Sequence, residues 1–109
     1  MDRVSLIKGE SRAIKAVVRT TPGQTLQITG TPTYELTDGN GTMVSSGNCG
    51  GWDTDAKQAP EAYAIVATEA MDPGAYDLLI TLDVVDSNSV QQRVKVHCVV
   101  EVIHHPPWP

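Results

Sequence analysis

The chain has 109 residues, of which 19% are charged, and its formal net charge at pH 7 is −5. A single domain of this length buries enough surface for one core without metals or disulfides. The acidic balance argues against a nucleic-acid or anionic-membrane partner, because both bind through a basic patch. No apolar stretch approaches the roughly 20 residues that span a bilayer, and residues 1–10 lack a signal-peptide pattern. We therefore expect a cytoplasmic site of synthesis and no membrane segment.

Short segments along the chain alternate apolar and polar residues with a period of two, which is typical of strands with one buried face. These segments cover residues 4–7, 12–20, 25–29, 33–37, 42–46, 62–68, 75–84 and 93–102. Gly30-Thr31-Pro32 is predicted to interrupt the strand pairing between residues 25–29 and 33–37, because Pro lacks the amide group that donates hydrogen bonds to a neighbouring strand. No segment has the pattern of an amphipathic helix, so we count seven or eight strands in all.

The alternation is clearest in residues 75–84, where Leu79 is the single exception, and in residues 93–102. In residues 62–68 the same reasoning places Tyr63 and Ile65 on the inward face. One core is predicted from the inward faces of the strands. It contains Ile14, Val18, Leu36, Tyr63, Ile65, Tyr76, Leu78, Ile80, Leu82, Val94, Val96 and Cys98.

Turn signals separate the strands. Thr21-Pro22-Gly23-Gln24 is predicted to be a turn, because Pro restricts φ and Gly tolerates positive φ. Asp38-Gly39-Asn40-Gly41 is the strongest hairpin signal, since Asp-Gly and Asn-Gly suit the primed turns of hairpins. Residues 47–58 are small and polar, and we expect them to form a loop.

These features predict an all-β fold, an antiparallel immunoglobulin-like β-sandwich of seven to eight strands. Residues 1–103 form the expected domain, and residues 104–109 form a Pro-rich tail that cannot pair into a sheet. Cys98 lies on an apolar strand face and Cys49 in the Gly-rich loop. Without an export signal, both cysteines are expected to be reduced.

Three sequence patterns raise the question of ligand binding. His104 and His105, with His97, suggest a metal, but adjacent histidines on an extended tail point in opposite directions and no ligand set has zinc spacing. The pattern Asp38-x-Asn40-x-Thr42 resembles the start of a calcium loop, but its twelfth position lacks the required acid. A solvated or interface-bound tail and a hairpin turn explain these two patterns, so no metal and no cofactor are expected.

The third pattern is Trp52 beside Asp53 and Asp55 in the predicted loop, which could grip a sugar or a cation. Solvated loop carboxylates and a Trp covering a sheet edge explain the same residues. The sequence has no nucleophile elbow, phosphate-binding glycine loop or oriented Cys/His pair. We therefore expect the protein not to be an enzyme.

The tail offers a candidate protein contact. Trp108 is flanked by Pro residues, and a stiff extended segment pays little entropy when it docks. We expect Trp108 to pack against a second subunit or a partner protein, with His104 and His105 at the rim. A disordered terminus is the alternative.

Three further motifs follow one another along the chain. They are Lys8-Gly9-Glu10, the hairpin with its following Val in residues 37–44, and Pro73-Gly74-Ala75-Tyr76. With them, residues 4–102 resemble the immunoglobulin-like domains of tailed-phage and prophage virion proteins, and especially the N-terminal domain family of upper baseplate proteins. The resemblance implies a non-enzymatic structural module of a phage tail, baseplate or fibre that assembles by protein–protein contact.

The partners that the resemblance implies are other virion proteins or further copies of the chain. The competing interpretation is a carbohydrate-binding or cell-surface adhesion module with the same sandwich, which would use Trp52 and the nearby acids as its platform. A hydrolase accessory domain is a third alternative.

Overall fold

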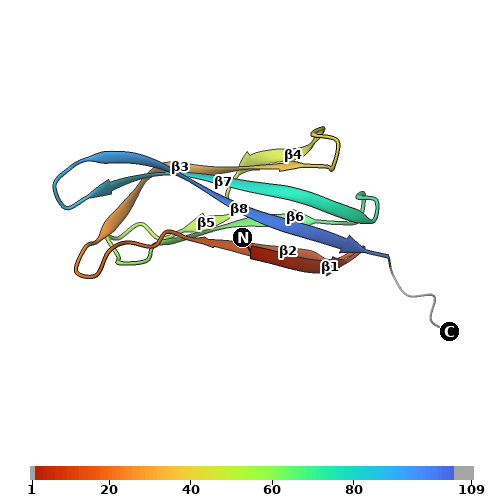
Figure 1. Cartoon of the computed structure of the whole chain (residues 1–109), viewed down its shortest axis with the longest axis horizontal. Coiled ribbons are helices and arrows are strands. Elements are labelled where there is room, and N and C mark those ends of the chain that lie inside the picture. The colour runs from red at the N-terminus through yellow and green to blue at the C-terminus, as the bar shows by residue number, and fades with distance from the viewer. Residues whose placement is uncertain (1, 105–109) are drawn as a thin grey trace.

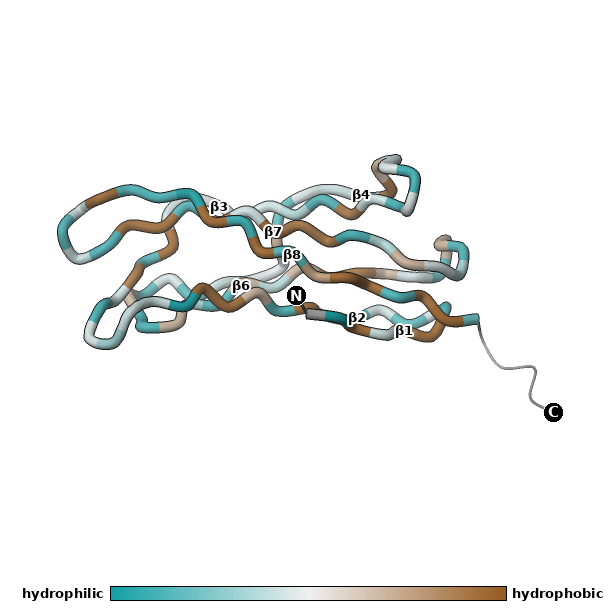
Figure 2. Tube along the Cα trace, in the orientation of Figure 1, coloured by the Kyte–Doolittle hydropathy of each residue, from teal (hydrophilic) through white to brown (hydrophobic). Residues whose placement is uncertain are grey.

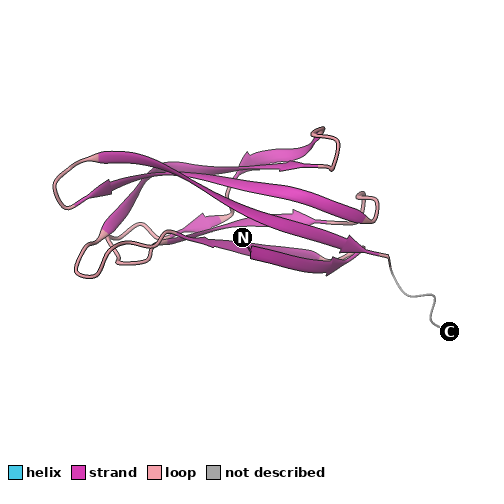
Figure 3. Cartoon of the chain, in the orientation of Figure 1, coloured by secondary structure: helices cyan, strands magenta, loops and turns pink. Residues whose placement is uncertain are grey.

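The computed structural model of the chain describes residues 2–104, and every regular element in this range is a β-strand (Figure 3). The strands are β1 (Asp2–Ile7), β2 (Ser11–Val17), β3 (Leu26–Thr37), β4 (Met43–Asn48), β5 (Gly51–Trp52), β6 (Glu61–Ala67), β7 (Gly74–Asp86) and β8 (Gln91–Ile103). The prediction of an all-β fold is therefore confirmed.

The strands form two facing layers, as expected for a β-sandwich (Figure 1). The large sheet has five strands in the order β1-β8-β7-β3-β4, and the small sheet has three in the order β2-β6-β5. All pairs are antiparallel except β1 and β8, which run parallel with Val4 opposite Val100. A purely antiparallel sandwich was predicted, and this pair corrects it. The chain crosses from the large sheet to the small one between β1 and β2, so β1 pairs with the last strand instead of with its sequence neighbour.

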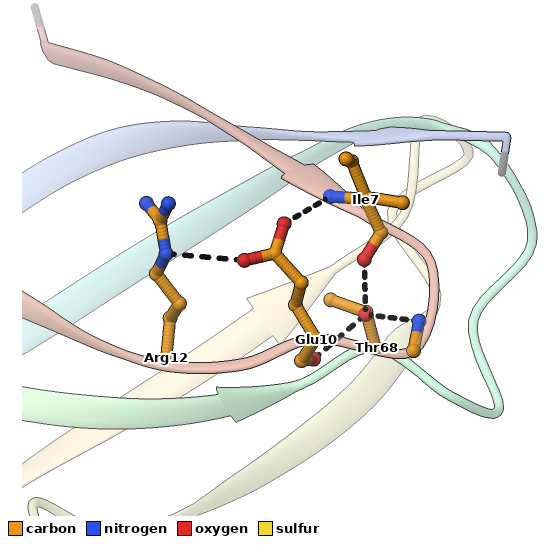
Figure 4. Close-up of polar contacts among 5 residues, drawn as sticks. Ile7, Glu10, Arg12 and Thr68 are labelled. Atoms are coloured by element: carbon orange, nitrogen blue, oxygen red, sulfur yellow. Dashed lines mark hydrogen bonds and ion pairs between the residues drawn. The ribbon is translucent and has the colours of Figure 1, made fainter. Parts of the chain in front are cut away.

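A buried threonine holds this crossing in place (Figure 4). The Thr68 side chain is fully buried. Its hydroxyl accepts a hydrogen bond from the Gly9 amide at 3.0 Å and donates to the Glu10 carbonyl at 2.8 Å. The Glu10 carboxylate accepts from the Ile7 amide at 2.7 Å and pairs with Arg12 at 3.3 Å. The Lys-Gly-Glu step thus serves as the corner between the two sheets.

The core lies between the sheets, and hydrophobic positions recur along the strands of both (Figure 2). Most of the predicted core residues are buried. They are Ile14, Val18, Leu36, Tyr76, Leu78, Ile80, Leu82 and Cys98. Val94 and Val96 are partly buried and pack against this cluster. The period-two pattern therefore identified the inward face of β7 correctly.

The predicted face of β6 is wrong. Tyr63 and Ile65 point outward, and 53% of Ile65 is exposed. The inward positions hold smaller side chains, namely Ala62, Ala64 and Val66. The two outward side chains lie over the adjacent glycines of the neighbouring chain segment, because a Cβ added to Gly51 would meet the Tyr63 ring at 2.5 Å and one added to Gly50 would meet both residues at 3.0 Å. The bulky residues thus fill space above a glycine pair instead of the space between the sheets.

Two predicted boundaries also change. β3 is continuous from Leu26 to Thr37, although Gly30-Thr31-Pro32 was predicted to break it. At the position of the predicted interruption, the pairing of β3 with β7 shifts register between Thr29 and Thr33. The predicted loop 47–58 contains the end of β4 and the two residues of β5.

Both cysteines are buried, as thiols and not as a disulfide within residues 2–104. Cys98 faces the core as predicted, and its sulfur lies 3.7 Å from the Val99 carbonyl oxygen. Desolvation raises the pKa of the Cys49 thiol, which disfavours the reactive thiolate. We therefore expect both thiols to react with a titrating reagent after unfolding and slowly before it.

Candidate functional site

The structure places the predicted Trp52 and acids at the turn that leaves β5. Trp52 pairs with the buried Ala62 and packs against the core, half-buried. Paired residues of neighbouring strands share a face, so the indole lies on the inner side of the small sheet. Asp53 follows it directly, and Asp55 is exposed in the next turn. Trp52 and Asp53 thus line one depression on the small sheet, and Asp55 does not line it.

Asp53 is engaged in local structure. One carboxylate oxygen accepts from the Glu61 amide at 2.9 Å, and the other pairs with Lys57 Nζ at 3.1 Å. The Asp53 amide also donates to the Glu61 carbonyl at 2.9 Å. The backbone hydrogen bond from Glu61, followed by the Lys57 contact, lowers the pKa of Asp53. Both oxygens therefore have protein partners, and the residue ties the turn to the start of β6.

An open depression of about 450 Å³ lies on the small sheet beside this turn. Its lining residues are Lys15, Gly51, Trp52, Asp53, Glu61 and Tyr63. Lys15 and Glu61 form an ion pair across it at 3.3 Å. Lys15 and Glu61 therefore neutralise each other, Asp53 pairs with Lys57, and the partly exposed Tyr63 ring lies over Gly51. Sequence reasoning did not anticipate Tyr63 here, because it placed that ring in the core.

The histidines do not come together. His97 lies on the outer face of the large sheet, with Nε2 2.7 Å from Asp77 Oδ1. His104 is exposed after the end of β8, and His105 and Trp108 lie outside the described residues. His104 lies seven residue steps after His97 along an extended chain, or about 23 Å. Within residues 2–104 no group of three or more His, Cys, Asp or Glu side chains could hold a metal ion.

The calcium-like pattern is a hairpin turn, as predicted, but it is not the expected primed turn, because the central Gly39 and Asn40 do not have positive φ and only Gly41 does, at +81°. Asp38 Oδ1 accepts from the amides of Asn40 and Thr42 at 2.9 and 3.0 Å. An Asp side chain that bonds the backbone two residues ahead stabilises a turn without a ligand. The turn connects β3 to β4, which pair in register from Thr33–Asn48 to Thr37–Met43 with one shift.

A feature that sequence reasoning missed is the open edge of β4. The edge strands are β1 and β4 in the large sheet and β2 and β5 in the small sheet. Natural edge strands commonly carry charged side chains, which oppose the pairing of the open edge with another chain. β1 carries Arg3, β2 carries Arg12 and Lys15, and β5 has only two residues. β4 has six residues, none of which is charged.

A hydrogen bond directly after β4 shows which backbone groups of the strand face outward. The Cys49 amide donates to the Pro32 carbonyl at 2.8 Å, so that residue faces β3. Because the orientation alternates along an antiparallel strand, Gly47 and Ser45 also face β3. The amide and carbonyl groups of Ser46 and Asn48 are therefore directed to the open side.

One signal in the sequence could have identified this edge. Residues 42–52 contain no charged residue, which is unusual for an exposed part of an acidic chain. Periodicity alone does not show it, because the order of strands in a sheet depends on contacts between distant parts of the chain.

The comparisons add no family to this description. No protein-family model matches the sequence, and no curated protein matches it at a significant level. Residues 2–104 also contain no helix that is long and apolar enough to cross a membrane.

Proposed function

We propose that the chain is a non-enzymatic, immunoglobulin-like assembly module that acts through protein–protein contact in a phage or prophage tail, baseplate or fibre. The observation that carries the proposal is the uncharged open edge of β4 (Met43–Asn48). An open edge binds other strands through main-chain hydrogen bonds, which is a recurrent way of joining protein chains. No cofactor or catalytic group is part of this role.

The strand order supports the immunoglobulin-like part of the proposal. In that fold strands B, E and D share one sheet, while G, F and C share the other, which variable-type domains extend with C′. Here β2-β6-β5 and β8-β7-β3-β4 have the same two orders. The remaining strand, β1, lies beside β8.

A tyrosine at the start of β7 gives independent support. The Tyr76 hydroxyl donates to the Asp72 carbonyl at 2.6 Å, four residues upstream. Immunoglobulin-like domains use such a tyrosine corner at the start of strand F, two residues before the second cysteine of the inter-sheet disulfide. Leu78 stands at that position and is fully buried. A hydrophobic contact would thus replace the disulfide between the sheets.

The phage or prophage location rests on the resemblance of the sequence motifs to virion domains. Two of them lie at corners of the fold: Lys8-Gly9-Glu10 between β1 and β2, and Pro73-Gly74-Ala75-Tyr76 at the entry to β7.

Protein contact is favoured over carbohydrate binding by the placement of Trp52. Sugar platforms need an exposed aromatic face, whereas this indole packs against the core. The neighbouring Asp53 carboxylate is also occupied by Lys57 and by the Glu61 amide. Two of the three residues considered for sugar binding, Trp52 and Asp53, are thus used by the fold itself.

The proposal is tested by locating the chain in particles. Tail particles are purified from an induced culture of the source strain, and their proteins are identified by mass spectrometry. We expect peptides of this chain at a fixed ratio to tail proteins through successive purification steps. Their absence from particles, together with binding of the purified chain to a glycan array, would overturn the proposal in favour of adhesion.

A further inference from the structure

The β4 edge has the properties of a self-pairing surface. We propose that two copies of this chain associate through antiparallel pairing of their β4 strands, with Ser46 of each copy opposite Asn48 of the other. This inference rests on the proposed function, because it names a second copy as one partner of the assembly module. The paired strands would join the two large sheets into one continuous sheet.

The first argument is hydrogen-bond complementarity. In an antiparallel pair, opposite residues that both face the partner exchange two backbone bonds. Ser46 and Asn48 are the outward-directed residues in the regular part of β4, after the register shift near Met43. Pairing Ser46 with Asn48 of the second copy, and the reverse, uses all four of their amide and carbonyl groups without involving the irregular end.

The side chains fit the same register. Ser46 pairs with Glu35 of β3 and Asn48 with Thr33, and all four residues are exposed. Because opposite residues share a face, the Ser46 hydroxyl would lie beside the Asn48 amide of the second copy, where the two can hydrogen-bond. At the centre, Gly47 would face Gly47 of the second copy, so no side chain obstructs the approach.

The net charge does not oppose this contact. The chain carries −5 overall, yet β4 itself has no charged residue. The nearest acid on the same face is Glu35, one strand away from the edge. Glu35 of the second copy would lie three strand spacings away, or about 14 Å, because the two β4 strands stand between the two β3 strands. This exceeds the Debye length of about 8 Å at physiological ionic strength, so their repulsion is largely screened.

The other edges lack these properties. Self-pairing along β2 would bring Arg12 and Lys15 near their equivalents in the second copy, and it would compete with their ion pairs to Glu10 and Glu61. β1 carries Arg3, which pairs with Glu101 at 3.0 Å. β4 is thus the long edge that two identical acidic chains can share without placing like charges opposite each other.

The test compares the full chain with two Ser-to-Lys variants by sedimentation velocity over a wide range of protein concentration. The unsubstituted chain should shift from monomer to dimer as concentration rises. Ser46→Lys should raise the dissociation constant of the dimer at least tenfold, because each copy would add one positive charge to the interface between the two β4 strands. Ser11→Lys makes the same change at an exposed position of β2 and should alter the dissociation constant less than twofold. A concentration-independent monomer, or a dimer that Ser46→Lys leaves intact, would overturn the inference.

Amide hydrogen exchange provides a site-specific measurement. Protection of the Ser46 and Asn48 amides should rise with protein concentration, whereas the Gly47 amide, which faces β3, should exchange at a constant rate. Circular dichroism and the melting temperature establish that each variant is folded. Equal behaviour of the three amides would contradict the proposed register and overturn it.

The outcomes separate this inference from the proposed function. If the chain is a monomer in solution but co-purifies with particles, the second copy is excluded while the assembly role stands. If Ser46→Lys then also lowers incorporation into particles, a strand of a different virion protein occupies the edge. If the chain dimerises as expected but is absent from particles, the self-pairing stands and the phage location fails.

Discussion

The central strands of the two sheets distribute large and small residues differently. β7 places Leu78, Ile80 and Leu82 inward and mostly polar residues outward. β6 places Ala64 inward and Ile65 outward. Both strands alternate, but only in β7 does hydrophobicity distinguish the faces. The comparison shows that a period of two identifies a strand, whereas the inward face is decided by the volume available between the sheets.

The largest expected difference between the sheets is the cost of truncating an isoleucine. Ile80→Ala removes a fully packed side chain from the core and should lower the free energy of unfolding by about 2–5 kcal/mol. Ile65→Ala removes an exposed side chain and should cost less than about 1 kcal/mol. Urea unfolding of both variants measures the difference. Equal losses would mean that β6 has the opposite register.

Enlarging a buried alanine of the small sheet tests how much space lies between the two sheets. Ala64 is fully buried, and Ala64→Leu should destabilise the fold by about 1–3 kcal/mol through overpacking. Ala67 is exposed on the same strand, so Ala67→Leu should change stability by about 0.5 kcal/mol or less. Thermal melting distinguishes these outcomes. A tolerated Ala64→Leu would show that the space between the sheets is wider than described.

A smaller effect is expected from removing one hydroxyl group. Tyr76→Phe deletes the hydrogen bond to the Asp72 carbonyl at the corner of the large sheet and should cost about 0.5–1.5 kcal/mol. Tyr63→Phe makes the same change on the outer face of the small sheet, where little change in stability is expected. Chemical denaturation of the pair measures the contribution of the corner. A neutral Tyr76→Phe would remove this support for the immunoglobulin-like assignment.

The smallest effect concerns the turn at β5 and depends on pH. The pKa of Asp53 is lowered in the folded state, so its ionised form stabilises the fold above the ordinary Asp pKa. This contribution is lost as the pH falls through the folded-state value. Asp53→Asn should therefore be less stable than the parent at neutral pH, and the difference should shrink below about pH 4. A difference that grows as the pH falls would contradict the assigned contacts.

Local chemistry accounts for the features that the sequence predicted correctly. Alternation located the strands, and Asp38-Gly39-Asn40-Gly41 located a hairpin because its turn conformation depends on these four residues. The inward face of β7 followed for the same reason, since its inward apolar residues alternate with Asp77, Thr81 and Asp83, and only Leu79 interrupts this pattern near the centre of the strand. The burial of Cys98 also followed from its place in an alternating strand.

The candidate site depended more on distant contacts. The sequence left open whether Trp52 forms part of a ligand platform or covers a sheet edge, and its pairing with the buried Ala62 directs it to the core. Tyr63 was expected in the core, but it lies over Gly51. Neither side chain's environment is encoded by its immediate neighbours. Each depends on which strand lies beside it, and local patterns carry no information about that.

The sequence by itself determined the strand content, the main hairpin and the inward face of β7, because these depend on backbone preferences and on a simple period. The tertiary structure alone decided the parallel pairing of β1, the inward face of β6 and the open edge of β4. The physical reason is that edges and faces are properties of pairs of strands. A strand such as β4 becomes an edge only because no other part of the described chain pairs with its second side.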